Sequence, residues 1–289
     1  MPFLGIKQAV ITDALVYSGV NAKGDDKSMT QIKHTILQRL REAEEQHQIK
    51  IPLAVESGSR GWGLAAYDAD YDCRFVYVHT KDWYLSIMDK KDYIDIASDA
   101  VYDVNGWDIK KFLIHMMKSN AVVSEWLSSN EVYIRNDAVV KPLQDLAAAL
   151  FNPIAASYHY LNTAKNKLSE ILSAEDAKIK KYFYALRPLA NLRYIQQYGK
   201  MPPMEYEQTL AAIEIPTEIS AAIKELLAIK RQSSEGQLMP RNKQIVRYIQ
   251  DDIQLIAEQI KEMKFTKSSE YETVDSVFRD TIEKVWHNG

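Results

Sequence analysis

The spacing of apolar residues predicts one helix and several strands in the first half of the chain. Between residues 29 and 48, apolar residues recur every three or four positions, at Ile32, Ile36, Leu37 and Leu40. Short runs rich in β-branched and aromatic residues predict strands at 51–57, 73–78, 100–104 and 132–135. A helical pattern over 109–116 separates the last two. The first half therefore predicts an α+β arrangement.

The second half has a different pattern. After Asp137 the strand signals stop, and long helical periodicities follow at 138–150, 154–172, 176–198, 205–230 and 242–287. With 289 residues, the chain exceeds what one hydrophobic core usually organises. We therefore expect an α+β domain over residues 1–136 and a mostly helical domain over 137–289, with a ligand site in the cleft between them.

Charge and composition exclude several classes of protein. The chain has 36 Lys and Arg against 39 Asp and Glu, a formal net charge of −3, which argues against a globally basic nucleic-acid-coating surface. The single cysteine, Cys73, excludes an intramolecular disulfide and a multi-cysteine zinc site. No apolar stretch approaches the ~20 residues of a membrane span. We expect a cytoplasmic protein that does not contact a membrane.

The segment from Glu56 to Phe75 carries the candidate chemistry. Gly58 allows a sharp turn after the strand at 51–57, and Ser59 adds a hydroxyl beside backbone N–H groups that can hold a phosphate. Asp70 and Asp72 are two residues apart at the start of the next strand, so their side chains share a face at about 6.6 Å spacing. Such carboxylates can share metal ions, and hard oxygen ligands favour Mg²⁺ or Mn²⁺.

A third acid would complete a two-metal site. Asp103 lies on the strand most suited to run alongside that of Asp70 and Asp72, and Asp99 and Asp108 compete with it for this role.

Basic and aromatic residues near these acids have two interpretations each. Arg60 can contact the nucleotide, or it can form an ion pair with the acids, and the same alternatives hold for Arg74. Farther along, a polar stripe at helical spacing suggests a triphosphate clamp, with an ordinary solvated face as the alternative; it contains Lys180, Lys181, Tyr184 and Arg187. Trp62 and Trp107 are expected to pack in the core, with base stacking as the alternative reading.

Together these motifs resemble the DNA polymerase β-type nucleotidyltransferase superfamily, and most closely the YcgL or RlaP family of predicted nucleotidyltransferases. The resemblance covers roughly residues 31–210. It rests on Gly58-Ser59-Arg60, Trp62-Gly63, Asp70-Tyr71-Asp72-x-Arg74-Phe75, residues 103–112, Glu125-Trp126-Leu127, residues 180–189 and Pro202-Pro203-Met204.

The resemblance implies a palm-like mixed sheet with flanking helices, a Gly-Ser loop that grips the nucleotide phosphates, and Mg²⁺ held by Asp70, Asp72 and Asp103. The implied reaction transfers an NMP from an NTP, with ATP the first candidate, to a hydroxyl acceptor and releases pyrophosphate. An RNA end is the expected acceptor. The alternatives are nucleotidylation of a protein or a small molecule, and a non-catalytic nucleotide-binding regulator; a homo-oligomer remains open.

Overall fold

The protein is built around a mixed β-sheet. The computed structural model describes residues 22–265 and 271–287, and within these residues the main sheet has five strands in the order β3-β4-β2-β1-β5. The strands are β1 (Lys50–Glu56), β2 (Tyr71–Val78), β3 (Tyr93–Ser98), β4 (Tyr102–Asp108) and β5 (Val132–Arg135). β2 and β4 are parallel, and the other neighbouring pairs are antiparallel.

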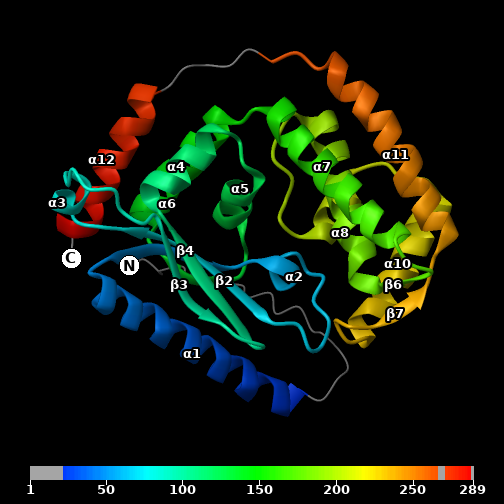
Figure 1. Ribbon diagram of the computed structural model, residues 1–289, viewed down its shortest axis with the longest axis horizontal. Coiled ribbons are helices and arrows are strands. Elements are labelled where there is room, and N and C mark those ends of the chain that lie inside the picture. Colours follow the sequence, from blue (N-terminus) through cyan, green and yellow to red (C-terminus); the bar gives the residue numbers. More distant parts are fainter. Residues whose placement is uncertain (1–21, 266–270, 288–289) are drawn as a thin grey trace, which may run out of the picture.

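Helices cover both faces of this sheet (Figure 1). α1 (Ala22–His47) crosses one face, and α4 (Ile109–Met117), α6 (Asp137–Leu150) and α12 (Tyr271–His287) cover the other. Side chains of β2 alternate between these layers. Phe75 is buried in the α1 layer, and Val76 is buried with residues of α4, α6 and α12. Asp72, at an even position like Val76, therefore faces away from α1.

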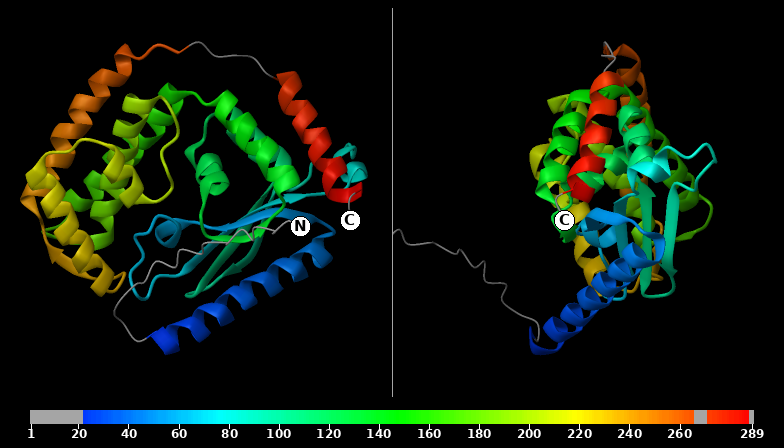
Figure 2. Two further views of the ribbon diagram at one scale, coloured as in Figure 1. Left: turned by 180° about the vertical axis from the view of Figure 1, so that it is seen from behind. Right: turned by 90° about the vertical axis from the view of Figure 1, so that its left-hand side faces the viewer.

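The second half forms a helical layer beside the sheet (Figure 2). Its elements are α7 (Pro153–Leu172), α8 (Ile179–Tyr198), α9 (Tyr206–Ala212), α10 (Thr217–Gln232) and α11 (Lys243–Glu262), with a small sheet of β6 (Asp176–Lys178) and β7 (Leu238–Pro240). Leu64 and Ala121 of the first half are buried in the helical core. The two halves are therefore packed against each other.

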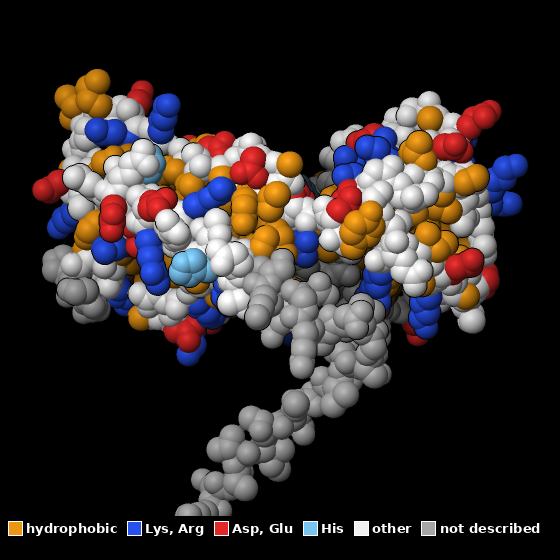
Figure 3. Space-filling model, turned by 90° about the horizontal axis from the view of Figure 1, so that it is seen from below, with side chains coloured by type: hydrophobic (Ala, Val, Ile, Leu, Met, Phe, Trp, Pro, Cys, Tyr) orange, Lys and Arg blue, Asp and Glu red, His pale blue; other side chains and the backbone are white. Residues whose placement is uncertain are grey.

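Three short helices lie in the connections between these elements: α2 (Gly58–Gly61), α3 (Lys81–Tyr84) and α5 (Ala121–Ser128). In the view from below, the outline of the molecule is indented between the sheet half and the helical half, and both signs of charge are interspersed on this face (Figure 3). Among the described residues, we find no helix with the length and apolar character needed to cross a membrane.

The α+β class is confirmed, and several element boundaries are corrected. The strand expected at 100–104 runs from Tyr102 to Asp108, and β3 was not predicted at all. β3 is an edge strand whose residues are half-buried or exposed, so its apolar alternation is weak.

The helical half also differs in detail from the expected pattern. The segment 176–198 begins with β6, Pro216 separates two helices within 205–230, and 242–287 is divided into α11 and α12. The domain boundary near residue 137 stays a prediction. The structure adds that both α6 and α12 pack against the sheet of the first half.

Candidate functional site

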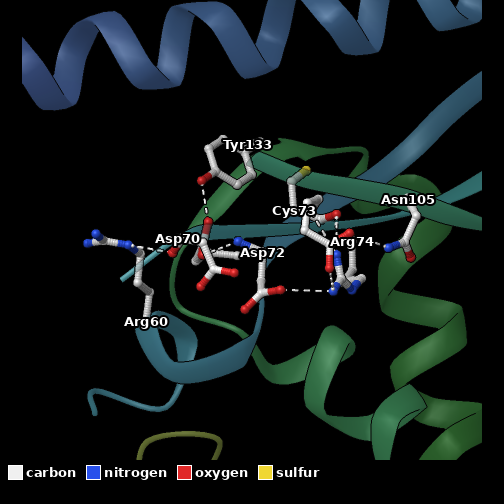
Figure 4. Close-up of polar contacts among 9 residues, drawn as sticks. Arg60, Asp70, Asp72, Cys73, Arg74, Asn105 and Tyr133 are labelled. Carbon is white, nitrogen blue, oxygen red and sulfur yellow. Dashed lines mark hydrogen bonds and ion pairs between the residues drawn. The ribbon is translucent and has the colours of Figure 1, made fainter. Parts of the chain in front are cut away.

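Two of the predicted acids meet on neighbouring strands. Asp72 on β2 and Asp103 on β4 are directly opposite each other in the parallel register, so their side chains leave the sheet on the same face. One nitrogen of Arg74, Nη2, lies 2.9 Å from Asp72 Oδ1 and 2.7 Å from Asp103 Oδ2 (Figure 4). The sheet thus brings two carboxylates to a single positive centre. Asn105 donates to the second oxygen of Asp103 at 2.8 Å.

Asp70 lies just before β2, in the loop, and its side chain is exposed. Its charge nevertheless acts on Asp72. Burial raises the pKa of Asp72, Arg74 lowers it, and the negative charges of Asp70 and Asp103 raise it further. The three acids therefore concentrate negative charge that Arg74 only partly balances.

The Gly58 turn is shaped around Asp72. Gly58 has φ +55°, in the left-handed region that favours glycine, and a Cβ built there would lie 1.8 Å from Asp72 Oδ2. The Ser57 N–H donates to the Asp72 carbonyl oxygen at 2.8 Å, which fixes the turn to the strand. Ser59 follows in α2 and is buried. The predicted phosphate loop and the predicted metal acid are thus in direct contact.

The structure distinguishes Asp103 from its two competitors. Asp99 is exposed, accepts hydrogen bonds from the N–H groups of Val101 and Tyr102, and lies 3.7 Å from Arg39. Asp108 is buried and caps α4, where its carboxylate accepts from the Lys110 N–H and the Tyr84 hydroxyl, both at 2.8 Å. Both residues have local structural roles, so Asp103 alone of the three lies beside Asp72.

Asp108→Asn should flatten the pH dependence of stability between about pH 4 and pH 6. Burial raises the pKa of Asp108 from 3.8 to about 6, despite the lowering effect of its hydrogen bonds. The folded protein therefore binds this proton more tightly than the unfolded chain. Asp108 accordingly makes stability fall as the pH rises through this window, by at most about 3 kcal/mol. Urea unfolding of both proteins at pH 4 and pH 6.5 measures the difference.

Equal pH slopes in the parent and the Asp108→Asn variant would contradict this assignment. Nucleotide transfer should stay at the parental rate in the variant, because Asp108 lies outside the acid pair.

Glu56 is a site residue that sequence reasoning missed. It is 3% exposed, accepts from the Asp72 N–H at 2.8 Å, and receives a very short hydrogen bond from the Tyr133 hydroxyl. Burial raises its pKa to about 7. Glu56 thereby ties β1, β2 and β5 together behind Asp72. Its signal in the sequence was an acidic residue at the end of the apolar run 51–55, directly before Ser57-Gly58.

Arg60 points away from the acid pair (Figure 4). It donates to the carbonyl oxygens of Asp70 at 2.9 Å and Ala69 at 2.6 Å, and its guanidinium lies 3.9 Å from the centre of the Tyr71 ring. Tyr71 is on the α1 face of the sheet. In this structure Arg60 therefore holds the loop that carries Asp70.

The predicted stripe on α8 is divided between different environments. Tyr184 contacts the Trp62 ring edge to face, with the ring centres 5.4 Å apart. Burial and the negative charges of Glu235, Asp72 and Asp70 raise its pKa to about 12. Lys181 is half-buried, with its Nζ 3.5 Å from Glu170.

Arg187 has a different environment from its neighbours on α8. It is 4% exposed and lies 2.8 Å from Glu125 Oε1, under the Trp62 ring at 4.1 Å. Its guanidinium thus lies beside the Glu125 carboxylate and the Trp62 ring, and Glu125 was not among the predicted site residues.

Comparisons with known proteins identify the family of this chain. The family model described as the RNA repair pathway DNA polymerase beta family, RlaP, matches residues 32–280, well beyond the 31–210 of the motif resemblance. The YcgL protein of Bacillus subtilis (strain 168) is 36% identical over 258 residues, which cover 89% of this chain and 99% of YcgL.

Among solved structures, a nucleotidyltransferase-like protein from Exiguobacterium sibiricum 255-15 is 12% identical, with a TM-score of 0.29, over 78% of this chain and 74% of its own. The family match covers both halves of the present structure, from α1 into α12. The chain belongs to the RlaP family of DNA polymerase β-like nucleotidyltransferases, a family assigned to RNA repair.

Proposed function

We propose that this protein is a divalent-metal-dependent nucleotidyltransferase that moves an NMP from an NTP to an RNA hydroxyl and releases pyrophosphate. One observation carries the proposal. The carboxylates of Asp72 and Asp103 both form ion pairs with the Arg74 guanidinium, next to the left-handed turn at Gly58. Family membership supports nucleotidyl transfer as the reaction class.

The residues present fit Mg²⁺ or Mn²⁺. The positively charged Arg74 guanidinium already lies between Asp72 and Asp103. The atoms available as metal ligands are carboxylate oxygens, which hard cations prefer. Within the part of the chain that the structure describes, no group of three acidic, His or Cys side chains is arranged to hold a metal. We propose Asp72 and Asp103, which lie side by side, as the principal ligands, and Asp70, exposed in the preceding loop, as the third.

The triphosphate is proposed to lie between the Gly58-Ser59 turn and α8. The first amide groups of a helix lack intrahelical acceptors, so the α2 turn offers N–H donors to phosphate oxygens. Lys181 supplies a positive charge and Tyr184 a hydroxyl from the opposite wall. Arg60 is proposed to act indirectly, by holding the Asp70 loop.

The proposed transfer is an in-line displacement at the α-phosphorus. The acceptor hydroxyl oxygen forms the new P–O bond, and the bond between the α-phosphorus and the bridging oxygen of pyrophosphate breaks. Asp103 accepts the proton of the hydroxyl. A bound divalent ion would neutralise charge on the phosphate oxygens as pyrophosphate leaves. Arg74 keeps Asp72 and Asp103 aligned.

An RNA acceptor is proposed because the family description names an RNA repair pathway. The test is incubation of the protein with each α-³²P-labelled NTP, Mg²⁺, and separate pools of RNA, protein and small molecules. We expect label in the RNA pool. Label in protein would instead show protein nucleotidylation, and NTP binding without any labelled product would show a regulatory module.

Lys181→Ala and Tyr184→Phe should each weaken NTP binding more than NMP binding, by about three- to tenfold, because the lost contacts are to the β- and γ-phosphates. Calorimetric titration with ATP and AMP measures both affinities. Lys165→Ala is the matched control, since this exposed lysine lies on the neighbouring helix α7. Equal weakening of ATP and AMP would show that the α8 residues contact another part of the nucleotide.

A further inference from the structure

A small cavity lies beside the proposed triphosphate site, between the end of α2 and helices α5, α7 and α8. Its volume is about 190 Å³, and its walls include Trp62, Val122, Glu125, Tyr160, Tyr184 and Arg187. Cavities for whole drug-sized ligands measure roughly 300–1,000 Å³. This cavity therefore suits one ring system of a nucleotide rather than the complete molecule.

The wall of the cavity contains a buried charged pair. Arg187 and Glu125 are 4% and 8% exposed and lie 2.8 Å apart. Glu125 also accepts from Trp62 Nε1 and the Tyr160 hydroxyl, each at 3.2 Å. The carboxylate thus accepts two hydrogen bonds and forms an ion pair with Arg187, whereas Arg187 Nε and Nη2 are buried without a hydrogen-bond partner among the described residues. Arg187 therefore has donor groups left for a ligand.

Aromatic rings connect this cavity to the acids. Trp62 directly follows α2, the helix that begins with Gly58 and Ser59. Its ring contacts Tyr184 edge to face, with the ring centres 5.4 Å apart. The Trp62 N–H donates to the Gly58 carbonyl oxygen at 3.1 Å, and the Gly58 turn lies directly against Asp72. A nucleotide whose phosphates lie on the Gly58 turn therefore has this cavity within reach of its base.

We propose that this cavity is the base subsite for the bound NTP, an inference that rests on the proposed function. The base packs against the aromatic rings of Trp62 and Tyr184, as bases do on aromatic platforms. Arg187 donates to an acceptor atom on the edge of the base, a ring nitrogen or an exocyclic oxygen. Glu125 holds the guanidinium in place and is a positioning residue.

The first test compares ligands on the unaltered full-length chain. Calorimetric titrations with each of the four NTPs and with inorganic tripolyphosphate separate the base from the phosphates. We expect at least one NTP to bind about tenfold or more tightly than tripolyphosphate, the gain typical of stacking on aromatic side chains. Equal affinities would overturn the base subsite and leave the phosphate site standing. Absence of binding by every ligand would overturn the proposed function as well.

The second test fills the cavity from α7. Thr163 is half-buried in its wall, and Asn166 is exposed on the same helix. Thr163→Trp should reduce NTP affinity to the level of tripolyphosphate and leave tripolyphosphate binding unchanged. Asn166→Trp, the control with the same new side chain, should alter neither. Equal weakening of both ligands by Thr163→Trp, or equal effects of the two variants, would overturn the proposal.

Discussion

Asp72→Asn should lower the rate of nucleotidyl transfer about a thousandfold or more, which corresponds to about 4 kcal/mol of lost transition-state stabilisation. Asparagine keeps the shape of the side chain and an oxygen toward Arg74, but it removes the charge that a metal ligand needs. The measurement is single-turnover transfer of labelled NMP with saturating Mg²⁺ and RNA. Mg²⁺ should also raise the melting temperature of the parent more than that of the variant.

The fold should survive this change. Burial and the charges of Asp70 and Asp103 raise the pKa of Asp72, so the site disfavours the charged form that asparagine replaces. Asp68→Asn is the matched control, because Asp68 lies in the loop just before β2, away from the acid pair, and its side chain accepts a hydrogen bond from the Glu235 N–H at 2.8 Å. Parental activity in the Asp72 variant would reject the transferase proposal.

Gly58→Ala should reduce transfer about a hundredfold and weaken NTP binding. The new Cβ would lie 1.8 Å from Asp72 Oδ2, so the acid or the turn has to move. A displacement of about 1 Å at a reacting centre can have an effect of this size. The same transfer assay and ATP titration measure the two effects.

Gly63→Ala is the control that separates the contact of the new Cβ with Asp72 from the strain of a left-handed backbone. Gly63 has φ +71°, and a Cβ there would meet no heavy atom within 4 Å. Both alanine variants should lose about 1 kcal/mol of stability from the left-handed conformation, yet only Gly58→Ala should lose activity. If Gly63→Ala loses as much activity, backbone strain is the cause, and the contact with Asp72 is not.

Local sequence patterns determined much of the architecture. Apolar periodicity identified α1, the strands β1, β2 and β5, and most of the helical half, because each element must bury one face. The family resemblance singled out Asp103 as the partner of Asp72, and the parallel register of β2 and β4 places the two acids opposite each other. The roles of the nine predicted site residues remain predictions for the experiments above.

Other features depend on contacts between residues far apart in the sequence. The edge strand β3 is stabilised by β4, and its own pattern was too weak to predict it. Glu56 is a site residue because Tyr133 and the Asp72 amide enclose it. Neither partner is adjacent to it in the chain.

The sequence by itself determined which residue types are available and which share a strand or a helix face. Only the tertiary structure decided which charges face one another. Arg187 shares a stripe with Lys181 and Tyr184, yet it is buried against Glu125, 62 positions earlier in the chain. The physical reason is that helical periodicity specifies a direction around the helix axis, whereas the packing of α5 against α8 specifies the partner and removes both charges from water.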